Sequence, residues 1–123
     1  MTGNPYDQES KPTVAWLWQA ITGIGLVVLL GLHMVANHFI ARGGLRDYAA
    51  VAAYLRNPII LVLEVLFLVC VTTHALLGVR AILLDFGLSN RVEQILTRVL
   101  KWIGVLTVSY GLVVTWFVVR VNG

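Results

Sequence analysis

The stretch PIILVLEVLFLVCVTTHALLGVRAILL, residues 58–84, decides the fold. Glu64, His74 and Arg80 are the strongly polar side chains in an otherwise apolar run. A helix needs about 20 predominantly apolar residues to cross the roughly 30 Å hydrocarbon core of a bilayer. We therefore predict that this stretch is a transmembrane helix.

Two further apolar segments lie on either side of it, at residues 14–41 and 99–119. Of the 123 residues, 59% are hydrophobic and 12% are charged. The mean hydropathy of +0.84 also separates the chain from ordinary soluble domains. We predict an all-α membrane protein with three transmembrane helices that pack with a partner subunit into a helical bundle.

The remaining residues divide into a tail and two connections. Residues 1–13 are expected to be a retained polar tail, because Asp7 and Glu9 do not suit a cleavable signal. Residues 14–123 then form the anchor domain. A short surface helix is predicted within the first connection, and Asn57-Pro58 is predicted to start the next span. In the second connection, Gly87 is a predicted C-cap and Ser89 or Asn90 a predicted N-cap.

The basic residues indicate contact with lipid head groups rather than nucleic acid. The net charge is +3, and the basic residues are spread over both connections without forming a run. Three spans place four of them on each side, so the positive-inside rule gives no orientation unless Arg80 is counted. These are Lys11, Arg91, Arg98 and Lys101 on one side, and Arg42, Arg46, Arg56 and Arg120 on the other.

One face of the central span combines a histidine, small residues and a carboxylate. At about 100° per residue, the following fall within roughly 40° of one another: Phe67, His74, Gly78, Ala81 and Asp85. A neutral imidazole can ligate haem iron, and small neighbours let a flat macrocycle approach the helix. His74 is therefore a candidate haem ligand with Gly78 beside it. The alternative is that His74 hydrogen-bonds a neighbouring helix.

His33 is the second candidate ligand. It shares a face of the first span with Gln19, Thr22, Leu26, Leu30 and Asn37, whereas His38 points elsewhere, near the membrane edge. His33 and His74 are predicted to differ in depth by about 12 Å, so one haem cannot use both. Either His74 alone binds one haem, or His33 adds a second.

Glu64 in the central span has two interpretations. A buried carboxylate can be the cation or proton site of a small transporter. It also lies only about 9 Å from the start of its helix, which favours partial solvation or an arginine partner.

The segment HALLGVRAILLDFG, residues 74–87, resembles a motif in the membrane anchor subunits of succinate dehydrogenase and fumarate reductase, the complex II family. The shared pattern is a histidine, a glycine four residues later, and an aspartate eleven residues after the histidine. The resemblance implies that His74 is an axial ligand of haem b and that Asp85 lies beside a quinone head group. Phe86 stands where the family often has a tyrosine.

The first span departs from the family's companion anchor subunit. In WLWQAITG, residues 16–23, Trp16 and Ala20 stand where that subunit has a serine and an arginine at the quinone. The chain therefore resembles the D-type anchor. The resemblance implies a multi-pass protein of the inner (cytoplasmic) membrane, with its N-terminus and Asp85 on the cytoplasmic side.

The resemblance also implies a function and a set of partners. A flavoprotein subunit with FAD oxidises succinate, an iron–sulfur subunit carries the electrons, and quinone is reduced at the membrane. This chain would be a subunit outside the catalytic core. With a second anchor subunit it would hold one or two haems b and part of the quinone site. Asp85 would relay protons, while Arg80 would hold Asp85 ionised or face lipid phosphates.

Two other functions are compatible with the residues. In a haem-free small transporter, Glu64 would bind a cation and the histidines would be structural. A cytochrome b anchor of another respiratory complex, such as a hydrogenase or formate dehydrogenase, would share the membrane histidines and the quinone.

Overall fold

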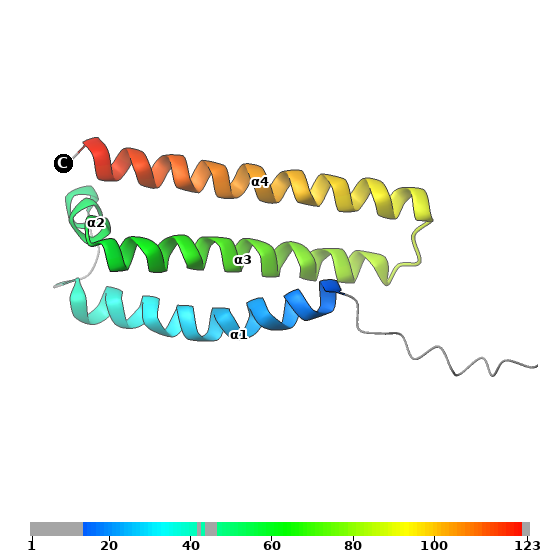
Figure 1. The fold of residues 1–123 in the computed structure, drawn as a ribbon, viewed down its shortest axis with the longest axis horizontal. Helices are drawn as coiled ribbons and strands as arrows, with labels where there is room; N and C mark the ends of the chain where they lie inside the picture. Colours follow the sequence, from blue (N-terminus) through cyan, green and yellow to red (C-terminus); the bar gives the residue numbers. More distant parts are fainter. Residues whose placement is uncertain (1–13, 42, 44–46, 122–123) are drawn as a thin grey trace, which may run out of the picture.

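The computed structural model describes residues 14–41, 43 and 47–121, so the predicted tail lies outside the described residues. Every regular element in these ranges is helical (Figure 1). The elements are α1 (Val14–Val35), the π-helical turn η1 (Ala36–Ile40), α2 (Tyr48–Leu55), α3 (Pro58–Leu84) and α4 (Asn90–Val121).

Three of the helices are long and apolar enough to cross a membrane, which confirms the predicted fold class. The candidate spans are Val14–Phe39, Pro58–Leu84 and Asn90–Val121. The third helix begins nine residues before the predicted span of 99–119. The first turns of this helix are polar. The prediction was based on apolar residues alone, so it placed the start of the span too late.

The two ends of α3 follow from local sequence. The Asn57 side chain accepts hydrogen bonds from the backbone nitrogens of Ile59 at 3.0 Å and Ile60 at 3.4 Å. Pro58 follows at the first helical position, where its missing N–H costs nothing. At the other end Gly87 has a φ of +67°, a left-handed conformation that glycine adopts without steric strain. The predicted start at Asn57-Pro58 is confirmed, whereas the C-cap is Asp85, and Gly87, which was predicted in that role, lies two residues later.

The first span ends in a wider turn than the sequence predicts. In η1, the backbone nitrogen of Ala41 donates to the carbonyl of Ala36 at 3.1 Å, an i to i−5 bond. Such turns are rare and are often found at functional sites. Of the predicted polar face, Asn37 lies within this wide turn and His33 lies three residues before it.

The bundle has α3 in the middle, between α1 and α4 (Figure 1). The short helix α2 lies across one end, against α3 and α4. The most buried residues gather at that end, where α2 contributes Ala52 and Tyr54. This helix was predicted, but it packs into the bundle rather than resting on its surface.

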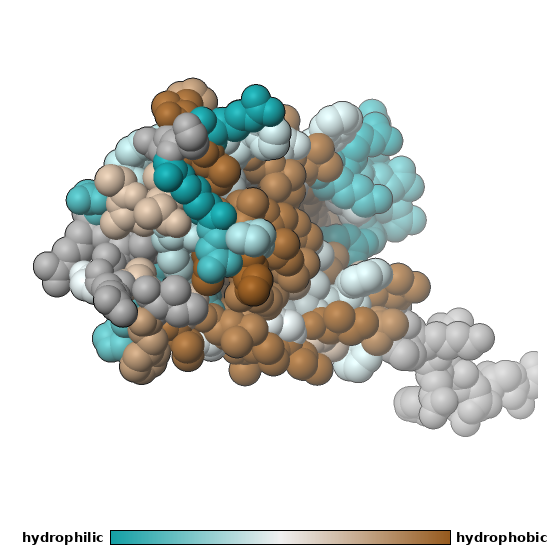
Figure 2. All heavy atoms as spheres, turned by 60° about the vertical axis from the view of Figure 1, so that its left-hand side comes forward, coloured by the Kyte–Doolittle hydropathy of each residue, from teal (hydrophilic) through white to brown (hydrophobic). Residues whose placement is uncertain are grey.

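Most of the apolar surface of the long helices is exposed. None of the residues of α4 is buried, and Figure 2 shows apolar side chains over much of the visible flank. A water-soluble monomer rarely exposes contiguous apolar area on this scale. The flank is suited to lipid and to other membrane subunits.

Close approach between α3 and α4 depends on two glycines. A Cβ at Gly104 would lie 2.8 Å from Leu76 Cδ1, and one at Gly111 would lie 2.5 Å from Leu68 Cδ2. The leucine side chains occupy the space that larger residues would fill, as at other small-residue contacts between membrane helices.

Candidate functional site

Two polar layers lie between α1 and α3, and each contains one of the candidate histidines. In the first layer, Nδ1 of His74 lies 3.2 Å from the carbonyl oxygen of Gln19 and 3.3 Å from Oγ1 of Thr22. The Thr22 hydroxyl donates its proton to the carbonyl of Trp18 at 2.7 Å. Both neighbours of Nδ1 therefore act as acceptors.

These contacts assign the tautomer of His74. A carbonyl oxygen can only accept, so Nδ1 must carry the proton. In the neutral imidazole Nε2 then keeps its lone pair, and it has no hydrogen-bond partner among residues 14–41, 43 and 47–121. A neutral imidazole whose other nitrogen donates to a carbonyl is the usual form of a metal-ligating histidine.

Glycines allow α1 and α3 to meet at this layer. A Cβ at Gly23 would lie 3.1 Å from Cε1 of His74, so the imidazole packs directly on the α1 backbone. A Cβ at Gly78 would lie 3.3 Å from Nε2 of Gln19. The space beside Gly78, which the sequence suggested for a macrocycle, therefore holds the Gln19 side chain. The Oε1 atom of Gln19 is buried without a hydrogen-bond partner in the described chain.

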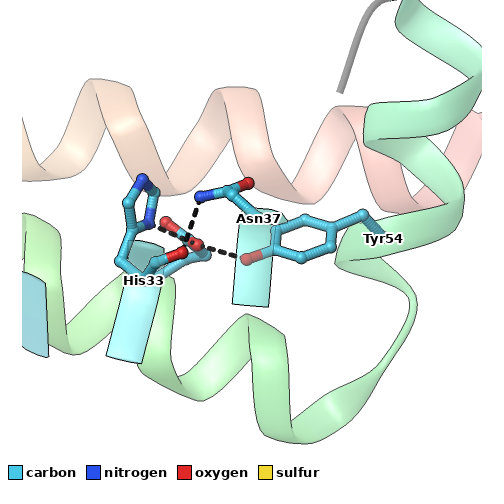
Figure 3. A network of polar contacts seen from close by, with 4 residues as sticks. His33, Asn37 and Tyr54 are labelled. Atoms are coloured by element: carbon cyan, nitrogen blue, oxygen red, sulfur yellow. Dashed lines mark hydrogen bonds and ion pairs between the residues drawn. The ribbon is translucent and has the colours of Figure 1, made fainter. Parts of the chain in front are cut away.

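The second layer is a network of three side chains from three helices (Figure 3). Nδ1 of His33 and Oε1 of Glu64 are 2.8 Å apart, and the Tyr54 hydroxyl donates to the same oxygen at 3.0 Å. The His33 ring stacks on Phe67 with centroids 5.1 Å apart. Asn37 donates from Nδ2 to the His33 carbonyl at 2.9 Å. When Glu64 is ionised, Nδ1 of His33 is the donor and its Nε2 is again free to accept.

This network gives Glu64 partners that the sequence did not suggest. An arginine or solvent was expected beside it, but among the described residues its side-chain hydrogen-bond partners are His33 and Tyr54. The side chain of His33 is 31% exposed and that of Glu64 is 21% exposed, so both groups are only partly buried. A cavity of about 450 Å³ lies beside them and is bounded by α2, α3 and α4.

Tyr54 is held in its neutral form. It lies on α2, outside the membrane-spanning helices, and burial raises the pKa of its phenol to about 12. The hydrogen bond to Glu64 and the charge of that carboxylate contribute to this shift in the same direction.

Alkaline titration checks this environment. Because the pKa is raised from 10 to about 12, the Tyr54 contribution to stability is complete below pH 10 and is lost as the pH rises through 12. In the intact complex, we expect Tyr54→Phe to remove a tyrosinate absorbance step near pH 12. A lost step near pH 10 would show that the phenol is not bonded to Glu64.

The two layers lie at different depths. His33 contacts Glu64 on α3, and His74 is ten residues further along that helix, or about 15 Å at 1.5 Å per residue. Two axial ligands of one iron would each have to lie about 2 Å from it. The imidazoles of one chain therefore cannot share an iron.

The polar residues at the far end of α3 are arranged differently from the prediction. Arg80 donates from Nε to Oγ1 of Thr97 at 3.0 Å and from Nη2 to Oε1 of Glu93 at 3.0 Å. It therefore joins α3 to α4 and does not hold Asp85 ionised. Asp85 is the exposed C-cap residue of α3 and has no ion pair in the described part of the chain. His38 is also exposed, as predicted for a residue near the membrane edge.

Some members of the site were missed by sequence reasoning. Tyr54 lies in a short helix between spans, where no periodic pattern links it to Glu64. Glu93 lies on α4, and its pairing with Arg80 depends on how the second connection turns. Among the described residues no three His, Cys, Asp or Glu side chains gather as a metal site. Each layer contains one of the two candidate imidazoles.

Comparison with known proteins agrees with the motif. A family model described as the succinate dehydrogenase/fumarate reductase transmembrane subunit matches residues 6–119. A succinate dehydrogenase hydrophobic membrane anchor subunit of Archaeoglobus fulgidus is 34% identical over 99 residues, which cover 80% of this chain and 84% of the relative. One of Thermoplasma acidophilum is 28% identical over 104 residues, covering 85% of each chain. No solved structure gives a significant match. The chain belongs to the transmembrane subunit family of succinate dehydrogenase and fumarate reductase, the membrane anchors of complex II.

Proposed function

We propose that this anchor subunit ligates haem b through His74 and forms part of the site where quinone is reduced with electrons from succinate. The observation that carries the proposal is the free Nε2 of His74, whose Nδ1 is bonded to the Gln19 carbonyl. The hydrogen bond fixes the tautomer and the ring orientation that an axial ligand needs. When bound, haem b supplies one-electron transfer at this level of the membrane.

His33 offers a second axial ligand of the same chemical kind. Its Nδ1 faces the Glu64 carboxylate at 2.8 Å and its ring is held by Phe67. A carboxylate on Nδ1 orients the imidazole and raises its basicity. Because the two layers are about 15 Å apart, we propose two haems, one that His74 would hold and one that His33 would hold, with a second anchor subunit contributing to both sites.

Asp85 is proposed to serve quinone. Reduction of a quinone takes up two protons, and an exposed carboxylate at a helix end can pass protons from water to a head group. Asp85 lies exposed at the end of α3 and is not paired with Arg80, which is hydrogen-bonded to Thr97 and Glu93. Phe86 beside it cannot supply a phenolic hydrogen bond.

Orientation and partners follow from the same proposal. The start of α1, the end of α3 and the start of α4 lie at one end of the bundle (Figure 1). This end is proposed to face the cytoplasm and the iron–sulfur subunit, with the flavoprotein subunit beyond it and the inner membrane around the helices. Family membership favours this function over a small transporter and over an anchor of another respiratory complex.

The test is the reduced-minus-oxidised visible spectrum of the complex, purified through a tag on this chain. We expect a b-type band, together with copurified soluble subunits and a second anchor. A complex that reduces quinone and shows no such band would overturn the haem assignment and leave the anchor function intact.

A glycine substitution tests the geometry at His74. In Gly23→Ala the new Cβ would lie 3.1 Å from Cε1 of His74, so the imidazole must shift by a few tenths of an ångström. A side chain forced from its preferred rotamer costs about 0.5–1.5 kcal/mol, so haem should be retained about two- to tenfold less tightly. Haem content after dilution into detergent measures this.

Gly31→Ala is the matched control on the same helix, because a Cβ there meets nothing within 4 Å. It should retain haem as the parent does. An equal loss of haem in both variants would mean that any glycine-to-alanine change in α1 weakens haem retention, and that contact with His74 is not the cause.

A further inference from the structure

A groove between α3 and α4 remains without a role in the proposed function. It has a volume of about 490 Å³ and lies near the Asp85 end of the bundle. Its walls are largely apolar, with Leu76 and Leu77 on α3 and Leu100 and Val105 on α4. Arg80 and Lys101 close its polar end.

A second hollow of about 390 Å³ adjoins this end of the groove. Both hollows share Arg80, Thr97 and Lys101, and the second adds Glu93 and Arg98 among others. Three cationic side chains therefore surround one carboxylate. Arg80 uses Nε and Nη2 on Thr97 and Glu93, and a guanidinium carries five N–H donors, so others remain for an anion.

We propose that this groove binds an anionic membrane lipid, with its phosphate among Arg80, Arg98 and Lys101 and one hydrocarbon chain between α3 and α4. The excess of positive charge matches a phosphate head, and the apolar walls match a chain. Along α3 the groove extends from Thr73 to Arg80, or about 10 Å. Basic pockets between membrane helices bind anionic lipid heads by this combination of contacts.

The site is separate from the proposed haem positions. Arg80 follows His74 by six residues, which turns it by roughly 120° around the helix. His74 accordingly faces α1 and Arg80 faces α4. A soluble anion would use only the cationic side chains. The apolar groove that continues from them along α3 and α4 is suited to a hydrocarbon chain, so it favours a lipid.

Native mass spectrometry of the intact complex tests the assignment, with phosphatidylglycerol and phosphatidylcholine as probes. We expect one phosphatidylglycerol per anchor chain and no comparable retention of phosphatidylcholine. A basic residue near the membrane surface contributes about 1 kcal/mol to anionic lipid binding. Lys101→Gln should therefore weaken retention about fivefold, and Lys101→Gln with Arg98→Gln about thirtyfold.

Arg91→Gln is the matched control, because Arg91 is an exposed basic residue of α4 that lines neither hollow. It should retain lipid as the parent does. Equal weakening by Arg91→Gln, or equal retention of both lipids, would overturn the site. Displacement by inorganic phosphate alone would indicate a soluble anion instead. Lipid uptake only after the soluble subunits are stripped would show that a subunit covers the groove.

Discussion

Asp85→Asn is expected to slow quinone reduction by about 10²- to 10⁴-fold while the complex still assembles. General acid–base catalysis contributes a factor of this size, and the amide keeps the volume of the side chain but cannot exchange a proton. Asp85 is exposed, so its replacement removes no buried contact. Quinone reductase activity should be measured beside succinate oxidation by a soluble dye, which draws electrons before the membrane and should be unaffected.

Asp47→Asn provides the control for this substitution. Asp47 caps α2 by accepting from the backbone nitrogen of Ala50 at 2.8 Å, and asparagine caps helices equally well. It makes the same chemical change at another exposed site. Unchanged quinone reduction by Asp85→Asn across the pH range would remove Asp85 from the mechanism.

The faces of the spans were predictable from helical periodicity. The predicted polar face of α1 and the His74 face of α3 contact each other, through Thr22 with His74 and His33 with Phe67. A period of 3.6 residues sorts side chains by direction without regard to what they meet. Periodicity could therefore predict which residues face each other but not their partners, and Leu30, Ala81 and Asp85, predicted on the same faces, are exposed.

The long-range contacts could not be predicted in the same way. Glu64 was interpreted alone because it lies off the His74 face, yet its side chain reaches His33 on α1 and Tyr54 on α2. Arg80 was expected to hold Asp85 ionised or to face lipid phosphates. The turn at Gly87 instead brings α4 alongside, where Glu93 provides the carboxylate.

The fit beside Gly78 shows a further limit of sequence reasoning. A glycine next to a candidate ligand indicates close approach, but it does not say what approaches. Here the approaching group is the Gln19 side chain, and the Gln19 backbone carbonyl holds His74. Gly78 therefore affects His74 indirectly, by making room for Gln19 of α1.

His74→Ala and His33→Ala are expected to remove different haems. Each substitution deletes the one imidazole that its layer offers, and the layers are about 15 Å apart along α3. Neither histidine can replace the other at that distance. Each variant should therefore lose one of two spectrally distinct b-type components and keep the other.

His38→Ala is the control for loss of a membrane histidine, since His38 is exposed beyond both layers. It should keep the haem content of the parent. A loss of haem in His38→Ala equal to that in His33→Ala would point to a general defect in folding of α1.

The haem content per complex, measured as pyridine haemochrome against flavin in the parent and both variants, tests both histidine assignments. We predict two haems in the parent and one in each of His74→Ala and His33→Ala. A parent value of one that is lost only in His74→Ala would remove the His33 haem. A haem content unchanged by His74→Ala would show that this residue is not an axial ligand.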